Sequence, residues 1–116
     1  MIVGIGVDIA EIARMERALE RTPALAERLF AHSERTKPIQ TLTGYFAAKE
    51  ALAKSLGAPP GMLWTDALIR NDEFGRPSIA VIGTVAAVAA ALRVGQFHVS
   101  ISHDGGLCVA MVVAER

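Results

Sequence analysis

The chain has 116 residues, which suits a single domain covering residues 1–116. Its 12 basic side chains equal its 12 acidic ones, which argues against a general attraction to nucleic acid. The single cysteine, Cys108, excludes an internal disulfide and a cysteine-based zinc site. No apolar run has the length of a membrane span and residues 1–9 do not resemble a signal peptide, so we expect a soluble cytoplasmic protein.

Residues 1–9, MIVGIGVDI, predict a β-strand. Alternation places Val3, Ile5, Val7 and Ile9 on one face, and Ile2, Gly4, Gly6 and Asp8 on the other. Two glycines within a strand often mark the close approach of a ligand or of another backbone. Asp8 therefore ends a face that the two glycines leave open.

Residues 10–21 predict an amphipathic helix with Ile12, Met15 and Leu19 on its buried side. Three arginines share the opposite side: Arg14, Arg17 and Arg21. A solvated face is the default interpretation of such residues, but three arginines on one stripe of a neutral chain favour a partner with acidic helices. After Thr22-Pro23 we expect a second short helix with Leu25, Leu29 and Phe30 inward, and then a loop over residues 31–42.

Residues 46–57, FAAKEALAKSLG, predict an alanine-rich helix that ends at Gly57. Glu50 and Lys54 are four residues apart, a spacing that stabilises a helix by roughly 0.2–0.5 kcal/mol. On spacing alone, solvation is the better interpretation of Lys49 and Lys54. Glu50 and the strand-end Asp8 also have the hard oxygen ligands that suit magnesium. The residues alone leave open whether these charges form a site.

The second half predicts two strands, 63–70 and 77–82, around the hairpin loop NDEFGR. A helix over 84–93 and a strand over 97–103 follow. Asp104-Gly105-Gly106 predicts a tight turn into the last strand, 107–114. That last strand is apolar on both faces, so both should be buried. A helix such as 84–93 would cover one face, and either a second layer or another copy of the chain would cover the other.

Polar residues in this half are ambiguous when taken alone. Ser102 and His103 are adjacent in a strand and point apart, which argues against a serine hydrolase. A lone histidine at a strand end is usually structural. Gly75-Arg76-Pro77 is explained by the turn that it closes, although Arg76 has the charge to hold a phosphate.

In combination, four stretches resemble the holo-(acyl carrier protein) synthase family, the short 4′-phosphopantetheinyl transferases. They are GIGVDI at 4–9, FAAKEALAK at 46–54, NDEFGRP at 71–77 and HVSISHDGG at 98–106, followed by an apolar strand ending in VAE. Their order and rough spacing also match, and the resemblance covers nearly the whole chain. It implies an α+β fold in which a small antiparallel sheet packs with helices and the subunits form homotrimers.

The resemblance implies an enzyme that moves the 4′-phosphopantetheine arm of coenzyme A to a serine of an apo acyl carrier protein or carrier domain. The other product is adenosine 3′,5′-bisphosphate, and the context is fatty acid biosynthesis. Asp8 and Glu50 would be the ligands of Mg²⁺, and the sequence does not distinguish Mg²⁺ from Mn²⁺. Lys54 would act at the phosphates as an electrostatic stabiliser or proton donor. A water beside the metal that passes the serine proton to Glu50 is one option for the base.

The same resemblance places Gly75, Arg76 and Pro77 beside the adenine and ribose, and His103 with Ser102 at the phosphates of coenzyme A. Coenzyme A would lie between subunits, and Arg14 would contact the acidic carrier. The sequence departs from the family in a shorter loop over 31–43 and at Tyr45, where several members have an arginine that helps to bind the nucleotide. Two alternatives are a metal-dependent phosphohydrolase that uses the same carboxylates and a non-catalytic module that binds an acidic partner.

Overall fold

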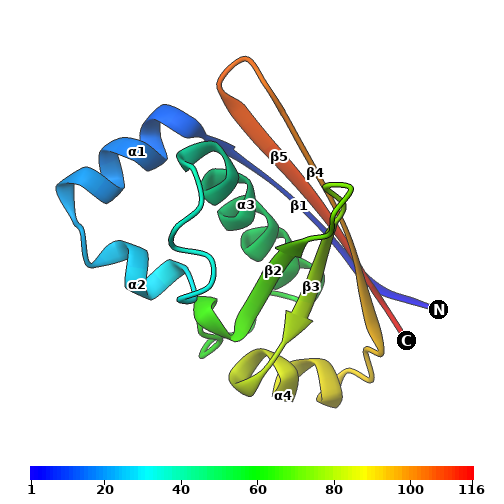
Figure 1. The fold of residues 1–116 in the computed structure, drawn as a ribbon. Helices are drawn as coiled ribbons and strands as arrows, with labels where there is room; N and C mark the ends of the chain where they lie inside the picture. Colours follow the sequence, from blue (N-terminus) through cyan, green and yellow to red (C-terminus); the bar gives the residue numbers. More distant parts are fainter.

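The computed structural model describes residues 1–116 and is organised around a three-stranded antiparallel sheet. Its strands lie in the order β1 (Ile2–Glu11), β5 (Leu107–Glu115) and β4 (Gln96–Asp104). The long helix α3 (Ile39–Ser55) packs against all three strands. Figure 1 views the sheet nearly edge-on, with α3 on one side and no other element on the opposite side.

Gly4 and Gly6 of β1 allow α3 to approach the strand closely. A Cβ atom added at Gly4 would lie 1.9 Å from the Ser55 carbonyl oxygen, and one added at Gly6 would lie 1.8 Å from the Ala51 carbonyl oxygen. No side chain fits at such distances, so the helix backbone rests directly on the strand. The feature that approaches this face is therefore another backbone, and Asp8 lies at the end of that contact.

The two faces of β5 have different surroundings. Residues on the α3 side are at most 1% exposed: Cys108, Ala110, Val112 and Ala114. Residues on the other side are 38–47% exposed: Leu107, Val109 and Met111. The predicted alternation is confirmed, but α3 covers the inner face and the 84–93 helix does not. No second layer of the chain covers the outer face.

Helix α3 buries its alanine-rich side in the core, where Ala47, Ala48 and Ala51 are completely inaccessible. The helix begins at Ile39, so the prediction of a loop as far as residue 42 was wrong. Pro38 lies immediately before the first turn. A proline costs nothing there because the N–H group that it lacks has no partner within the helix.

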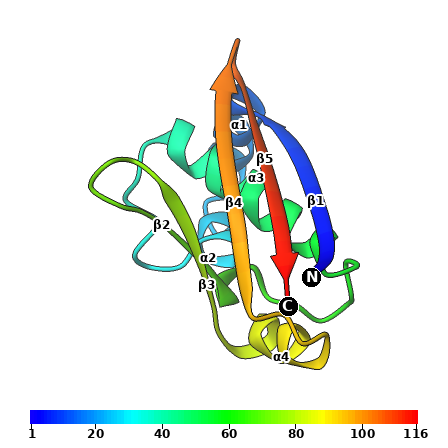
Figure 2. The same ribbon diagram turned by 90° about the vertical axis from the view of Figure 1, so that its right-hand side faces the viewer.

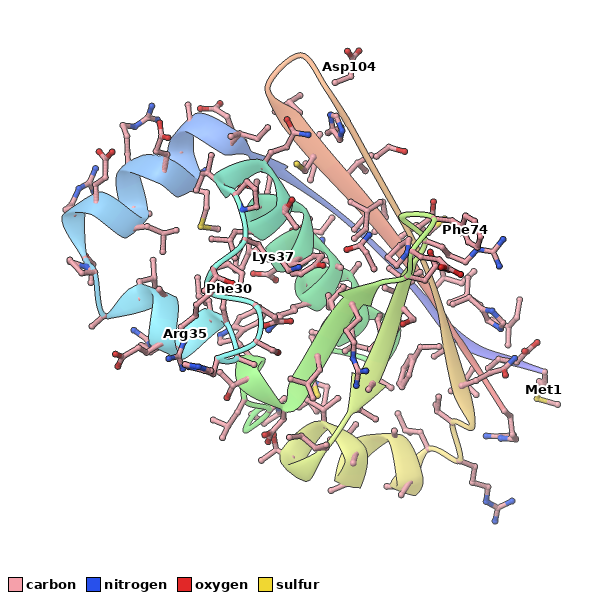
Figure 3. All side chains as sticks on the ribbon, in the orientation of Figure 1. Met1, Phe30, Arg35, Lys37, Phe74 and Asp104 are labelled. Atoms are coloured by element: carbon pink, nitrogen blue, oxygen red, sulfur yellow. The ribbon has the colours of Figure 1, made fainter.

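Helices α1 (Ile12–Arg21) and α2 (Leu25–Leu29) follow β1, and Phe30 lies fully buried after them (Figure 3). The predicted helix at 10–21 therefore begins two residues later, because β1 continues to Glu11. No helix of the protein has the length and apolar character needed to cross a bilayer.

A separate hairpin is formed by β2 (Ala67–Asn71) and β3 (Pro77–Val81), and α4 (Gly83–Ala91) follows it. Figure 2 shows the hairpin loop projecting beyond the side of β4. Trp64–Asp66 form a 3₁₀ turn instead of the start of the predicted strand. The Thr84 hydroxyl accepts a hydrogen bond from Leu63 N at 2.9 Å, and Asp66 Oδ2 accepts one from Thr84 N at 2.8 Å. These two bonds attach the 3₁₀ turn to the first turn of α4.

Candidate active site

Asp8, Glu50 and Lys54 come together where β1 meets the second half of α3. The ammonium group of Lys54 donates to Asp8 Oδ1 at 3.0 Å and to the carbonyl oxygen of Val7 at 3.0 Å. Glu50 lies one turn before Lys54 on the same helix. The structure thus assembles the three residues that the sequence proposed as a site, and we name them the carboxylate–lysine group.

The pKa of Glu50 reflects its burial and the charges of its two neighbours in the site. Burial raises the pKa of Glu50, the negative charge of Asp8 raises it further, and the positive charge of Lys54 counteracts part of the rise. Lys54 remains half-exposed, whereas only 19% of the Asp8 side chain is accessible. Asp8 and Glu50 can carry two negative charges, and Lys54 balances one of them. The group can therefore accept another cation.

The donor set fits magnesium that is held jointly by protein and substrate. No cluster of three or more histidine, cysteine or carboxylate residues exists in the protein, so a cage made of protein ligands alone is absent. Mg²⁺ commonly binds one or two carboxylates and completes its octahedron with waters and substrate phosphates. Asp8 and Glu50 supply those carboxylates, and Lys54, whose ammonium lies 3.0 Å from Asp8 Oδ1, adds a positive charge beside them.

Lys49 has a different role from its neighbours, and the expectation that it is solvated was wrong. Its side chain is 1% exposed, and its ammonium donates to Glu34 Oε1 at 2.7 Å, to Leu29 O at 2.8 Å and to Trp64 O at 3.1 Å. The second oxygen of Glu34 accepts from Ile69 N at 2.9 Å. Lys49 therefore joins α2, the 31–38 loop, the 3₁₀ turn and β2 from the interior.

A second group of predicted residues lines a cavity on the other side of α3. The cavity has a volume of about 350 Å³, and its walls include Gly75, Pro77 and His103. Gln40, at the start of α3, lies within hydrogen-bond distance of His103, 2.9 Å between their Nε2 atoms. Arg76 is exposed and does not line this cavity. We name this hollow the hairpin cavity.

The hairpin cavity and the carboxylate–lysine group lie on opposite flanks of α3. Tyr45 lines the cavity, and Lys54 follows it by nine residues, which places the two side chains roughly 180° apart around the helix axis. Ser102 is separate again, because the strand register puts it on the outer face of the sheet while His103 faces inward. One chain therefore does not bring all the predicted site residues together.

The three arginines of α1 are exposed, as the periodicity predicted. Arg17 makes a long surface contact of 3.7 Å with Glu11. Arg14 borders a mostly apolar groove of about 440 Å³, whose walls include Met15, Phe46 and Trp64. Charge and apolar surface are therefore combined on this side of the molecule.

Two features of the site could not be recognised from sequence patterns. Trp64 lines both the groove beside Arg14 and an apolar cavity of about 220 Å³ that Glu50 borders. Tyr45 is 2% exposed and bonds through its hydroxyl to Asn71. A lone tryptophan in a loop and a tyrosine within a helix carry no spacing signal, since their partners come from distant parts of the chain.

Comparisons with known proteins identify the family of this chain. The family profile described as the 4′-phosphopantetheinyl transferase superfamily matches residues 4–112. The holo-[acyl-carrier-protein] synthase of Kocuria rhizophila is 58% identical over 115 residues, which cover 99% of this chain and 94% of that protein.

Solved structures have the same fold along the whole chain. The crystal structure of holo-[acyl-carrier-protein] synthase from Neisseria meningitidis has a TM-score of 0.90 and 29% identity, with 100% of each chain covered. The Helicobacter pylori holo-[acyl-carrier-protein] synthase in complex with coenzyme A has a TM-score of 0.84 and 30% identity, with 96% of this chain and 99% of that one covered. The chain therefore belongs to the 4′-phosphopantetheinyl transferase superfamily and, within it, to the holo-[acyl-carrier-protein] synthase family.

Proposed function

We propose that this protein transfers the 4′-phosphopantetheine arm of coenzyme A to a serine of an apo acyl carrier protein in fatty acid biosynthesis, and releases adenosine 3′,5′-bisphosphate. The observation that carries the proposal is the meeting of Asp8, Glu50 and Lys54 between β1 and α3. The relative from Kocuria rhizophila is named for this activity, and the Helicobacter pylori structure contains coenzyme A.

Asp8 and Glu50 would hold Mg²⁺, which supplies charge neutralisation at the phosphates when bound. Lys54 would turn from Asp8 to a phosphate oxygen and stabilise the charge that develops during transfer. Its half-exposed ammonium is free to make that movement. Attack at phosphorus depends mainly on alignment and charge compensation, and these are what the three side chains offer.

The nucleotide end of coenzyme A would lie at the hairpin cavity, against Gly75, Pro77 and His103. Arg76, which is exposed between Gly75 and Pro77, would contact it from outside the cavity. This assignment explains why the cavity contains a histidine and several polar walls but no acidic side chain. Ser102 stays a prediction. Its position on the outer face of the sheet would place it at a contact between subunits.

The complete active site would be shared between subunits of a homotrimer. The outer face of β1 and β5 is apolar and uncovered, with Ile9 60% and Met111 47% exposed. A second copy that packs there would bring its own hairpin cavity toward the carboxylate–lysine group of the first. This exposed face supports the proposal of a partner subunit, and the number three comes from the family resemblance.

The carrier would dock on α1, where Arg14, Arg17 and Arg21 offer positive charge beside the apolar groove. Charged contacts at such an interface mainly govern encounter and specificity. An acidic carrier helix with one apolar side chain for the groove fits both features.

The decisive experiment incubates the protein with Mg²⁺, coenzyme A and an apo acyl carrier protein, followed by mass spectrometry of the carrier. We expect the carrier to gain the mass of one phosphopantetheine arm, together with stoichiometric release of adenosine 3′,5′-bisphosphate. Breakdown of coenzyme A without a carrier would instead support a phosphohydrolase. Carrier binding without any mass gain would support a binding module.

A further inference from the structure

A two-step hydrogen-bond relay runs from α3 to the loop of the β2–β3 hairpin. The hydroxyl group of Tyr45 donates to Asn71 Oδ1, and Asn71 Nδ2 donates to the carbonyl oxygen of Gly75 at 2.8 Å. A backbone carbonyl can only accept, so the amide nitrogen must face Gly75 and the amide oxygen must face Tyr45. The chemistry of the two ends therefore fixes the direction of the whole relay.

The hairpin loop is otherwise bonded only to itself. Asp72 Oδ1 accepts from Phe74 N at 2.8 Å and from Arg76 N at 2.9 Å, and Asp72 N donates to Arg76 O at 2.9 Å. These bonds fix the shape of the loop, which carries the 86% exposed Phe74 at its tip (Figure 3). The relay is the hydrogen-bonded link between this closed loop and the body of the protein.

The relay also forms a wall of the hairpin cavity. Tyr45, Asn71, Gly75 and Pro77 line that cavity together with His103, which comes from β4. Because α3 is packed in the core, the position of Tyr45 is fixed. Its bond to Asn71 therefore helps to fix the position of the hairpin loop. The width of the cavity between Gly75 and His103 is therefore set in part by a hydroxyl group that is almost completely buried.

We propose that Tyr45 is a positioning residue that acts through Asn71 to hold the Gly75–Pro77 loop at the spacing from His103 that the nucleotide end of coenzyme A requires. This inference rests on the proposed function, which assigns that end of the substrate to the hairpin cavity. Tyr45 has no charge to offer a phosphate, so its effect on binding is geometric and does not depend on salt.

The surroundings of Tyr45 keep its hydroxyl group protonated. Burial raises the pKa of Tyr45, and the negative charge of Glu34 raises it further. The phenol therefore stays protonated at neutral pH and keeps a proton to donate to Asn71. This agrees with the direction that Gly75 imposes on the amide.

The test uses Tyr45→Phe, which removes the hydroxyl and keeps the ring. We expect the KM for coenzyme A to rise roughly three- to tenfold, the change that corresponds to one lost hydrogen bond. The kcat and the KM for the carrier should stay the same. The Kd of adenosine 3′,5′-bisphosphate, measured by calorimetry without any catalysis, should rise by the same factor at low and at high salt.

Thr43→Val is the matched control, because it also removes a buried hydroxyl from α3. The Thr43 hydroxyl donates only to the Ile39 carbonyl oxygen of its own helix, at 2.7 Å. Both variants should lower the Tm slightly, but only Tyr45→Phe should weaken coenzyme A. A purely structural role for Tyr45 predicts equal effects on binding in the two variants and would overturn the proposal.

A double variant tests the relay itself. Asn71→Ala should weaken coenzyme A at least as much as Tyr45→Phe does, and adding Tyr45→Phe to it should cause no further loss, since groups that act as a unit are not additive. Additive losses would contradict the relay. An active wild type with an unchanged KM in Tyr45→Phe overturns only this inference, whereas a wild type that never modifies a carrier overturns the proposed function.

Discussion

We expect the carboxylate of Glu50 to be required for activity and, at the same time, to lower the stability of the fold. Because folding raises the pKa of Glu50, ionisation of this carboxyl group costs folding free energy as the pH rises through that pKa. At neutral pH without metal, Glu50→Gln should therefore raise the Tm. The same substitution should reduce transfer on the order of 10²-fold or more, because one of the two carboxylates that would hold Mg²⁺ at the reacting phosphates is lost.

The measurement pairs thermal denaturation in EDTA with the transfer assay in Mg²⁺. Glu27→Gln is the control, since Glu27 is exposed on α2 and distant in sequence from the site. It should change neither quantity. Full activity of Glu50→Gln at ordinary magnesium would end the assignment of this residue as a metal ligand, and a lower Tm would show that its charge stabilises the fold.

Lys49 and Lys54 lie on the same helix but should differ strongly in their effect on stability. Lys49→Met would leave the buried carboxylate of Glu34 without its partner, a loss of about 3–5 kcal/mol for such pairs. Lys54→Met breaks a pair in which the lysine is half-exposed, worth about 0–1 kcal/mol. Urea denaturation at one fixed protein concentration compares the two. Equal losses would mean that the buried pair is not formed.

At the scale of elements, the closeness of α3 and β1 depends on the absence of a side chain at Gly6. Gly6→Ala would place a Cβ 1.8 Å from the Ala51 carbonyl oxygen, so α3 must move away from the strand. We expect a loss of stability of about 1–3 kcal/mol or more, and a loss of transfer because Asp8 separates from Lys54. Urea denaturation and the transfer assay measure the two effects.

Gly95→Ala is the matched control for this strand glycine. Its added Cβ would have its nearest neighbour at 3.9 Å, an ordinary contact. This substitution should leave both stability and transfer close to the wild type. If Gly6→Ala behaves in the same way, α3 does not rest on the backbone of β1.

These elements also show how far local patterns lead. The glycines of β1 and the alternation in β5 predicted a close approach and two faces, because both depend on side chains within one strand. The start of α3 and the burial of Lys49 were missed because the deciding contacts come from other segments. Glu34 is 15 residues before Lys49, and no periodicity connects a loop carboxylate to a helix lysine. The relay from Tyr45 to Asn71 spans 26 residues and was missed for the same reason.

At the scale of the whole molecule, the uncovered outer face should drive association. Exposed apolar residues from β1 and β5 adjoin there, including Val7 and Met111, which are opposite each other in the strand register. A contiguous apolar surface of this kind usually marks an interface. We expect a particle of about three times the 12.3 kDa chain mass in sedimentation equilibrium. Met111→Lys should dissociate it, whereas Ile82→Lys, which charges a 49% exposed position off the sheet, should not.

The sharing of the active site can be tested by mixing two inactive variants. Glu50→Gln damages the carboxylate–lysine group and leaves the hairpin cavity intact, while His103→Ala does the reverse. In a trimer that pairs one group from each neighbour, equal mixing and reassembly should restore about one site in four, because each variant supplies the half that the other lacks. If both halves came from the same chain, no mixture would contain an intact site. If mixed oligomers form but remain inactive, each subunit carries its own complete site. If activity is recovered, Met111→Lys can be added to both variants. Loss of the recovered activity would then show that the outer face brings the two halves of the site together.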